Sequence, residues 1–89
     1  MLQQTTTIIN KLGLHARAAA KFVTQASLFD SEITLKRENR EVNGKSIMGV
    51  MMLAAAKGTE IELMTDGTDE EQAMSSLLDL IQNRFGENE

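Results

Sequence analysis

Two kinds of hydrophobic periodicity alternate along this chain, and their succession restricts its possible folds more than any single motif does. Residues 5–9 are all β-branched, and residues 31–37 and 59–65 alternate between apolar and polar side chains, which is typical of half-buried strands. Residues 16–26 instead place apolar side chains at steps of three and four, which is typical of an amphipathic helix. This succession of strand-like and helix-like segments favours an α+β fold.

Local signals complete the predicted order of elements. Residues 41–43 follow a short polar connection and are expected to pair with the preceding strand as a hairpin. Ser46 is a good N-cap, and Gly58 stands where the residue just past a helix C-terminus belongs, so we predict a second helix between them. The capping-box spacing at 68–71 precedes an apolar stripe that runs to Phe85, which predicts a third helix.

The predicted order is therefore β-α-β-β-α-β-α. Two split β-α-β units of this kind form an open-faced β-sandwich, in which a four-stranded antiparallel sheet is covered on one face by three helices. A chain of 89 residues is long enough for one modest core and too short for two. We therefore expect a single domain over residues 1–89, working as a monomer.

Composition excludes several classes of function. The chain has no cysteine, and its single histidine and scattered carboxylates show no metal-ligand spacing, so we expect no metal site. No apolar run approaches the roughly 18 residues of a membrane span, so we expect a soluble protein without membrane insertion. The lack of cysteine fits a reducing compartment, and we expect the cytoplasm. The net charge of −4 and the absence of Tyr and Trp argue against binding to nucleic acid.

The segment NKLGLHARAAAKF, residues 10–22, contains the single histidine at the predicted start of a helix. A helix N-terminus leaves about four backbone amides unpaired and carries roughly half a positive charge, so it attracts anions, phosphate in particular. If the helix begins near Ala16, His15 occupies the N-cap and Gly13 allows a sharp entry of the chain. Arg17 adds a guanidinium suited to two phosphate oxygens.

The residues alone leave two interpretations of this cluster open. In the first, His15 is a helix cap or surface residue and Arg17 is a solvated helix charge. In the second, the neutral imidazole is a nucleophile that takes up a phosphoryl group covalently, held by the helix amides and by Arg17. The same donors would stabilise the charge-rich transition state of phosphoryl transfer. On physical grounds alone, these residues support the two interpretations about equally.

A family resemblance separates them. The segments GLHARAAAKFV and GKSIMGVMMLAAAKGTEIEL, about thirty residues apart, closely resemble the histidine-containing phosphocarrier proteins, the HPr family of the bacterial phosphoenolpyruvate-dependent phosphotransferase system. The likeness extends over essentially the whole chain. The family usually has proline directly after the arginine, where this chain has Ala18. A helix can start without that proline. The departure from the family pattern bears instead on the rigidity of the loop, and hence on the rate of transfer.

The resemblance implies a phosphocarrier protein. It implies that His15 accepts a phosphoryl group from phosphorylated enzyme I and passes it to a IIA-type protein, with Arg17 and the backbone at Ala16 binding the phosphoryl group. Such a carrier is loaded and unloaded stoichiometrically, so it is an enzyme only by convention. No cofactor is implied.

Ser46 has two interpretations. As a plain N-cap it would satisfy one helix amide and contribute about 1 kcal/mol. The resemblance implies that it is also a regulatory phosphorylation site for an HPr kinase/phosphorylase. A phosphate at a helix N-terminus is favourable electrostatically, so its effect would lie at the surface, where new negative charge repels an acidic partner.

The methionines of the second predicted helix are also open to two interpretations. They can fill irregular gaps in the core, or they can form an exposed and adaptable surface for several partners. The resemblance favours the surface, because in the family the helices after the histidine and after the serine form a shared docking face. The contact residues it implies are Ala20, Ile47, Met48, Gly49 and Met51.

Two rival functions belong to other classes. The first is a regulatory binding module controlled by phosphorylation of Ser46, with little or no use of His15. The presence of both His15 and Arg17 argues against it, whereas Ala18 keeps it open. The second is a small RNA-binding module of similar element order, which the acidic balance and the lack of exposed aromatic side chains argue against.

Overall fold

The alternating periodicities fold into strands and helices in the predicted order. The computed structural model describes residues 1–89. Its elements are β1 (Leu2–Thr7), α1 (Ala16–Ala26), β2 (Glu32–Arg37), β3 (Arg40–Asn43), α2 (Ile47–Met52), β4 (Glu60–Asp66) and α3 (Glu70–Gln82), followed by a 3-10 turn, Arg84–Gly86. None of these helices is long and apolar enough to cross a membrane.

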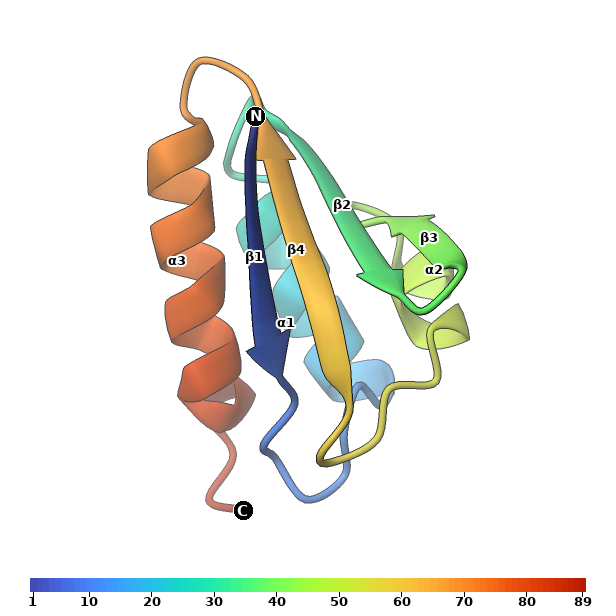
Figure 1. Cartoon of the computed structure of the whole chain (residues 1–89). Coiled ribbons are helices and arrows are strands. Elements are labelled where there is room, and N and C mark those ends of the chain that lie inside the picture. Colours follow the sequence, from blue (N-terminus) through green and yellow to red (C-terminus); the bar gives the residue numbers. More distant parts are fainter.

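The four strands form one antiparallel sheet in the order β1-β4-β2-β3. The last strand of the sequence thus lies between the first two, and the helices cover one face of the sheet (Figure 1). This confirms the predicted open-faced sandwich. Alternate residues of β2 and β4 point into the layer between sheet and helices, where they meet the apolar sides of α1 and α3. The fully buried large side chains there include Phe22, Ile33, Leu35, Ile61, Leu63, Leu77 and Ile81.

The first strand begins earlier than predicted and ends at Thr7 rather than at residue 9. Ile8 leaves the strand but stays fully buried, and its carbonyl accepts a hydrogen bond from the Gly58 amide at 2.7 Å. The end of β1 is therefore determined by contact with the segment before β4. The β-branched composition of residues 5–9 does not reveal such a contact.

The second helix is half the predicted length, because it ends at Met52 and not at residue 57. Ala54, with φ of +53°, takes the left-handed position that we assigned to Gly58. Two side chains stabilise this early end: Arg37 donates to the carbonyls of Leu53 at 2.9 Å and Ala54 at 3.1 Å, and Arg40 donates to that of Met52. Charged side chains of the β2–β3 hairpin thus satisfy helix C-terminal carbonyls.

The start of the third helix also differs from the prediction. The N-cap is Asp69 rather than Thr68, and the Asp69 side chain makes no capping bond to its own helix. Its carboxylate instead accepts hydrogen bonds from the Asp30 amide at 2.9 Å and the Ser31 amide at 3.0 Å. It therefore joins α3 to the turn that precedes β2. At the other end of the element, Phe85 is fully buried as predicted, but it lies in the 3-10 turn beyond the helix.

Candidate functional site

The loop that precedes α1 is held against the segment that follows α2. Gly13 has φ of +68°, and a Cβ atom at this position would lie 2.5 Å from the carbonyl oxygen of Ala55. The next residue, Leu14, donates its amide to that same carbonyl at 2.9 Å. Only glycine fits both the backbone angle and the close approach, and the contact determines where the chain enters the helix.

His15 is the N-cap of α1, as predicted. Its backbone is extended, its carbonyl accepts the first helical bond from the Ala19 amide at 2.8 Å, and its side chain makes no capping bond. The imidazole therefore points outward, and its side chain is 27% exposed. The amides of Ala16 and Arg17 have no hydrogen-bond partner in the protein. They are the unpaired donors that an anion would meet at this helix end.

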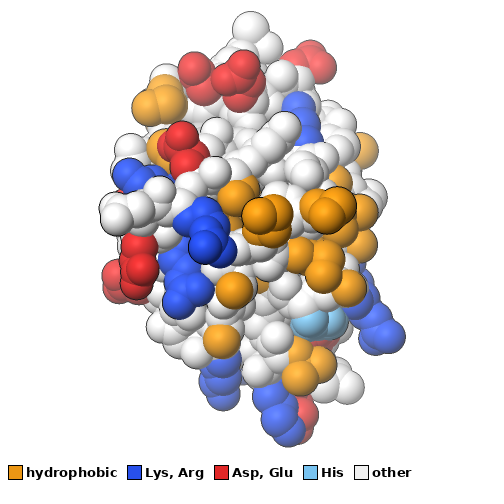
Figure 2. All heavy atoms as spheres, turned by 90° about the vertical axis from the view of Figure 1, so that its right-hand side faces the viewer, with side chains coloured by type: hydrophobic (Ala, Val, Ile, Leu, Met, Phe, Trp, Pro, Cys, Tyr) orange, Lys and Arg blue, Asp and Glu red, His pale blue; other side chains and the backbone are white.

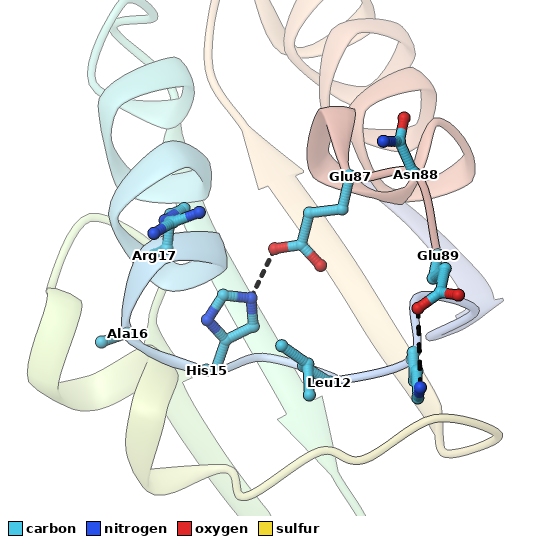
Figure 3. Close-up of a pocket in the computed structure, with 8 residues that line it drawn as sticks. Leu12, His15, Ala16, Arg17, Glu87, Asn88 and Glu89 are labelled. Carbon is cyan, nitrogen blue, oxygen red and sulfur yellow. Dashed lines mark hydrogen bonds and ion pairs between the residues drawn. The ribbon is translucent and has the colours of Figure 1, made fainter.

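The imidazole is held on one side by a carboxylate. Its Nε2 atom contacts the Glu87 carboxylate in a short hydrogen bond, and Glu87 belongs to the C-terminal segment that lies beside the start of α1 (Figure 3). The other ring nitrogen, Nδ1, faces away from Glu87 and has no hydrogen-bond partner. A ring whose Nε2 proton is donated to a carboxylate has its free electron pair on Nδ1.

Glu87 is suited to remain ionised beside the ring. Burial acts to raise the pKa of this carboxyl, but hydrogen bonds from the side chains of Asn10 and His15 outweigh it, and the net pKa lies below the ordinary value of 4.5. Glu87 was not among the residues predicted from the sequence. It lies 72 residues after His15, and no motif spacing connects the two, so only the folded chain brings them together.

Arg17 is the second residue of α1 and is exposed. Its guanidinium forms no ion pair or hydrogen bond within the protein, and it lines the same open pocket of about 790 Å³ as His15, Ala16 and Glu87. The imidazole, the start of the helix and the free guanidinium thus lie around one pocket, as expected. Ala18 is fully buried in the first turn of the helix, which forms without proline.

Ser46 is the N-cap of α2, as predicted. Its Oγ accepts a hydrogen bond from the Gly49 amide at 3.1 Å, and the residue is partly exposed. Gly49 has a local reason to lack a side chain, because a Cβ atom there would lie 3.3 Å from the Ser46 Oγ and 3.4 Å from the Asn43 carbonyl oxygen. The hydroxyl is therefore a working helix cap that solvent and partners can still reach.

The methionines of α2 lie at the surface rather than in the core. Met48 is 74% exposed, Met51 42% and Ile47 44%, whereas Val50 of the same helix is fully buried. Leu12, 67% exposed, continues this apolar surface beside the histidine. Figure 2 shows hydrophobic side chains gathered around the pale-blue imidazole on the face that carries α2. Ala20, on α1, is partly buried. We call the surface formed by Leu12, Ile47, Met48 and Met51 the apolar rim.

Fold and site together define a class: an open-faced β-sandwich protein that presents a lone histidine at an anion-binding helix N-terminus, with an apolar rim beside it. Comparison with known proteins agrees. The family model described as "PTS HPr component phosphorylation site" matches residues 2–83. The chain belongs to this family, the HPr phosphocarrier proteins of the phosphotransferase system.

Relatives match the chain from end to end. It is 63% identical to the phosphocarrier protein HPr of Neisseria meningitidis serogroup A over 89 residues, which cover 100% of both chains. Identity to the HPr of Cupriavidus necator is 61%, again over 100% of both. The crystal structure of an HPr from Thermoanaerobacter tengcongensis superposes with a TM-score of 0.96 at 48% identity, covering 100% of both chains.

Proposed function

We propose that His15 is the phosphorylated residue, accepting a phosphoryl group from phosphorylated enzyme I and passing it to a IIA-type protein in the cytoplasm. The single observation that carries this proposal is the arrangement of the ring. Nε2 is bound to Glu87, which leaves the ring's electron pair on Nδ1, and the same residue caps the helix end where the amides of Ala16 and Arg17 are unpaired.

The proposed transfer is an in-line displacement at phosphorus. The Nδ1 electron pair forms the new P–N bond while the P–N bond of the donor histidine breaks, and that bonding pair returns to the donor ring. The proton on Nε2 of His15 stays in place. The transferred group carries its negative charge to a position where the helix N-terminus and the Arg17 guanidinium can stabilise it.

Exposure of these donors limits how tightly the phosphoryl group is held. Arg17 and the helix end face water, so their electrostatic contribution is weakened by the high dielectric constant and by salt. A carrier needs this moderate stabilisation, because a group that is bound too tightly cannot be passed on. The chain is then loaded by one partner and unloaded by the next, which is the behaviour of a stoichiometric carrier.

Mass spectrometry tests the site directly. After incubation with enzyme I and phosphoenolpyruvate, the protein should gain one acid-labile phosphoryl group, and the His15→Ala variant should gain none. Ser46→Ala is the matched control, because it also removes an N-cap side chain near this face yet should still be loaded. A phosphoryl group retained on His15→Ala would contradict the proposal.

We further propose that Ser46 is a regulatory site for an HPr kinase/phosphorylase. Its hydroxyl is partly exposed at a helix N-terminus, where a phosphate would be tolerated by the helix and would add charge beside the exposed Ile47 and Met48. Phosphorylation with this kinase should add an acid-stable group to the wild type and to His15→Ala, but not to Ser46→Ala. Modification of Ser46→Ala would place the site elsewhere.

The apolar rim is the proposed docking surface for both transfer partners, together with Ala20 and Gly49. It borders the imidazole, and flexible thioethers can adapt to partners of different shape. A purely regulatory module would not require a free Nδ1 and an unpaired guanidinium around one pocket, so the geometry favours a carrier.

A further inference from the structure

The C-terminal segment is built onto the phosphorylation site rather than trailing away from it. Phe85 is fully buried, and its carbonyl accepts a hydrogen bond from Lys21 of α1 at 2.8 Å. Beyond Glu87, the Glu89 carbonyl accepts a bond from the Lys11 amide, and the Glu89 side chain forms an ion pair with Lys11 at 3.5 Å. The segment is thus attached to the site on both sides of Glu87.

The Glu87 carboxylate is itself fixed in orientation. One oxygen, Oε1, accepts a hydrogen bond from the Asn10 side-chain amide at 3.1 Å, and the other contacts Nε2 of His15. Asn10 is fully buried and also donates to the Gly13 carbonyl at 2.8 Å. The series of hydrogen bonds from Asn10 through Glu87 to His15 therefore begins in the loop that positions the histidine.

We propose that Glu87 is a positioning residue for phosphoryl transfer, which keeps the proton of His15 on Nε2 and so presents the electron pair of Nδ1 to the incoming phosphorus. This inference rests on the proposed role of His15. It assigns to the C-terminal segment a part in the reaction that a plain structural tail would not have.

The carboxylate acts in two ways during the step. Before transfer, its hydrogen bond selects the ring tautomer and restricts rotation of the imidazole. As the P–Nδ1 bond forms, the ring loses electron density, and the ionised carboxylate on Nε2–H stabilises the positive charge that develops there. No proton leaves the ring, so the step is balanced by the bond that breaks on the donor. The lowered pKa of Glu87 keeps the carboxylate ionised near neutral pH.

The first test observes the unphosphorylated ring. In ¹H–¹⁵N spectra recorded at about pH 8, where imidazoles are mostly neutral, the wild type should show protonated Nε2 with a downfield, exchange-protected proton. Glu87→Gln should keep this proton but shift it upfield, because an amide oxygen is a weaker acceptor. Glu87→Ala should lose it to exchange with water. The matched control, Glu89→Gln, removes the same charge from the same segment but keeps the bond from the Lys11 amide to the Glu89 carbonyl, so it should leave the proton unchanged.

The second test measures single-turnover transfer from phosphorylated enzyme I at saturating concentration. Loss of a charge-assisted hydrogen bond should slow Glu87→Ala by about tenfold, with Glu87→Gln at an intermediate rate and Glu89→Gln at the wild-type rate. A saturating rate in Glu87→Ala equal to that of the wild type, or an unshifted ring proton in Glu87→Gln, would overturn the proposal.

Failure of the site assignment would look different. If another residue is phosphorylated, His15→Ala is still loaded, whereas the ring proton of His15 in the protein with histidine still depends on Glu87. Should Glu87→Ala unfold, Glu87→Gln decides alone, since wild-type rate and wild-type proton shift in that variant both count against positioning.

Discussion

At the residue scale, two glycines with positive φ angles differ in their surroundings and so provide a matched pair. Gly13 faces the Ala55 carbonyl, whereas a Cβ at Gly58 would meet nothing within 4 Å. Gly13→Ala should therefore lower the free energy of unfolding by at least about 2 kcal/mol, through backbone strain and displacement of the loop. Gly58→Ala should cost only about 1 kcal/mol. Equal losses in urea denaturation would contradict this account of the loop.

Asp69 makes stability depend on pH. The hydrogen bond from the Ser31 hydroxyl and that from the Asp30 amide lower the pKa of its carboxyl below the ordinary 3.8. A lowered pKa means that the carboxylate stabilises the fold fully above that ordinary value, and that this contribution is lost as pH falls through the folded-state pKa.

We therefore expect Asp69→Asn to be less stable than the wild type at neutral pH and to approach it in acid, as pH falls through the lowered pKa of Asp69. The exposed Asp79, whose side chain accepts no hydrogen bond in the structure, supplies the control Asp79→Asn. Thermal unfolding across this range checks the sign. A difference between Asp69→Asn and wild type that widened in acid would be the opposite result.

At the scale of the element, the end of α2 provides a stabilising substitution. Ala54 is exposed and adopts φ of +53°, a region that glycine occupies without strain. Ala54→Gly should raise the free energy of unfolding by about 0.5–1 kcal/mol, because it removes the left-handed strain. Ala56→Gly, two residues further at an exposed site without positive φ, should instead lower it by about 0.5 kcal/mol. Chemical denaturation of the two variants distinguishes relief of backbone strain at Ala54 from the greater flexibility that glycine gives the unfolded chain.

At the scale of the whole molecule, the apolar rim should control partner binding without controlling stability. Met48→Glu places a charge at the most exposed methionine of the rim, so the KM for phosphorylated enzyme I should rise by about tenfold. Stability should stay within about 0.5 kcal/mol of the wild type. Leu28→Glu is the control, because Leu28 is 71% exposed just beyond the far end of α1 from His15. Transfer kinetics in which both variants behave alike would argue against docking on the rim.

The order of the elements and the place of His15 and Ser46 as N-caps were predictable because short-range patterns determine them. Apolar spacing identifies a helix or strand, and a cap depends on residues within one turn. The prediction that the α2 methionines could form a surface also agrees with the exposure observed. The element order and the two caps depend on neighbouring residues, whereas the surface interpretation of the methionines came from the family resemblance.

Other features arose only when distant segments met. Helix α2 ends early because Arg37 and Arg40, brought alongside by the hairpin, satisfy its last carbonyls. Asp69 turns from its own helix to the turn before β2. Glu87 reaches His15 because α3 and the buried Phe85 return the chain to the start of α1. The sequence by itself determined which segments form and where the histidine begins a helix, since those depend on neighbours. The tertiary structure decided which carboxylate faces that histidine, because strand order and helix packing set such contacts.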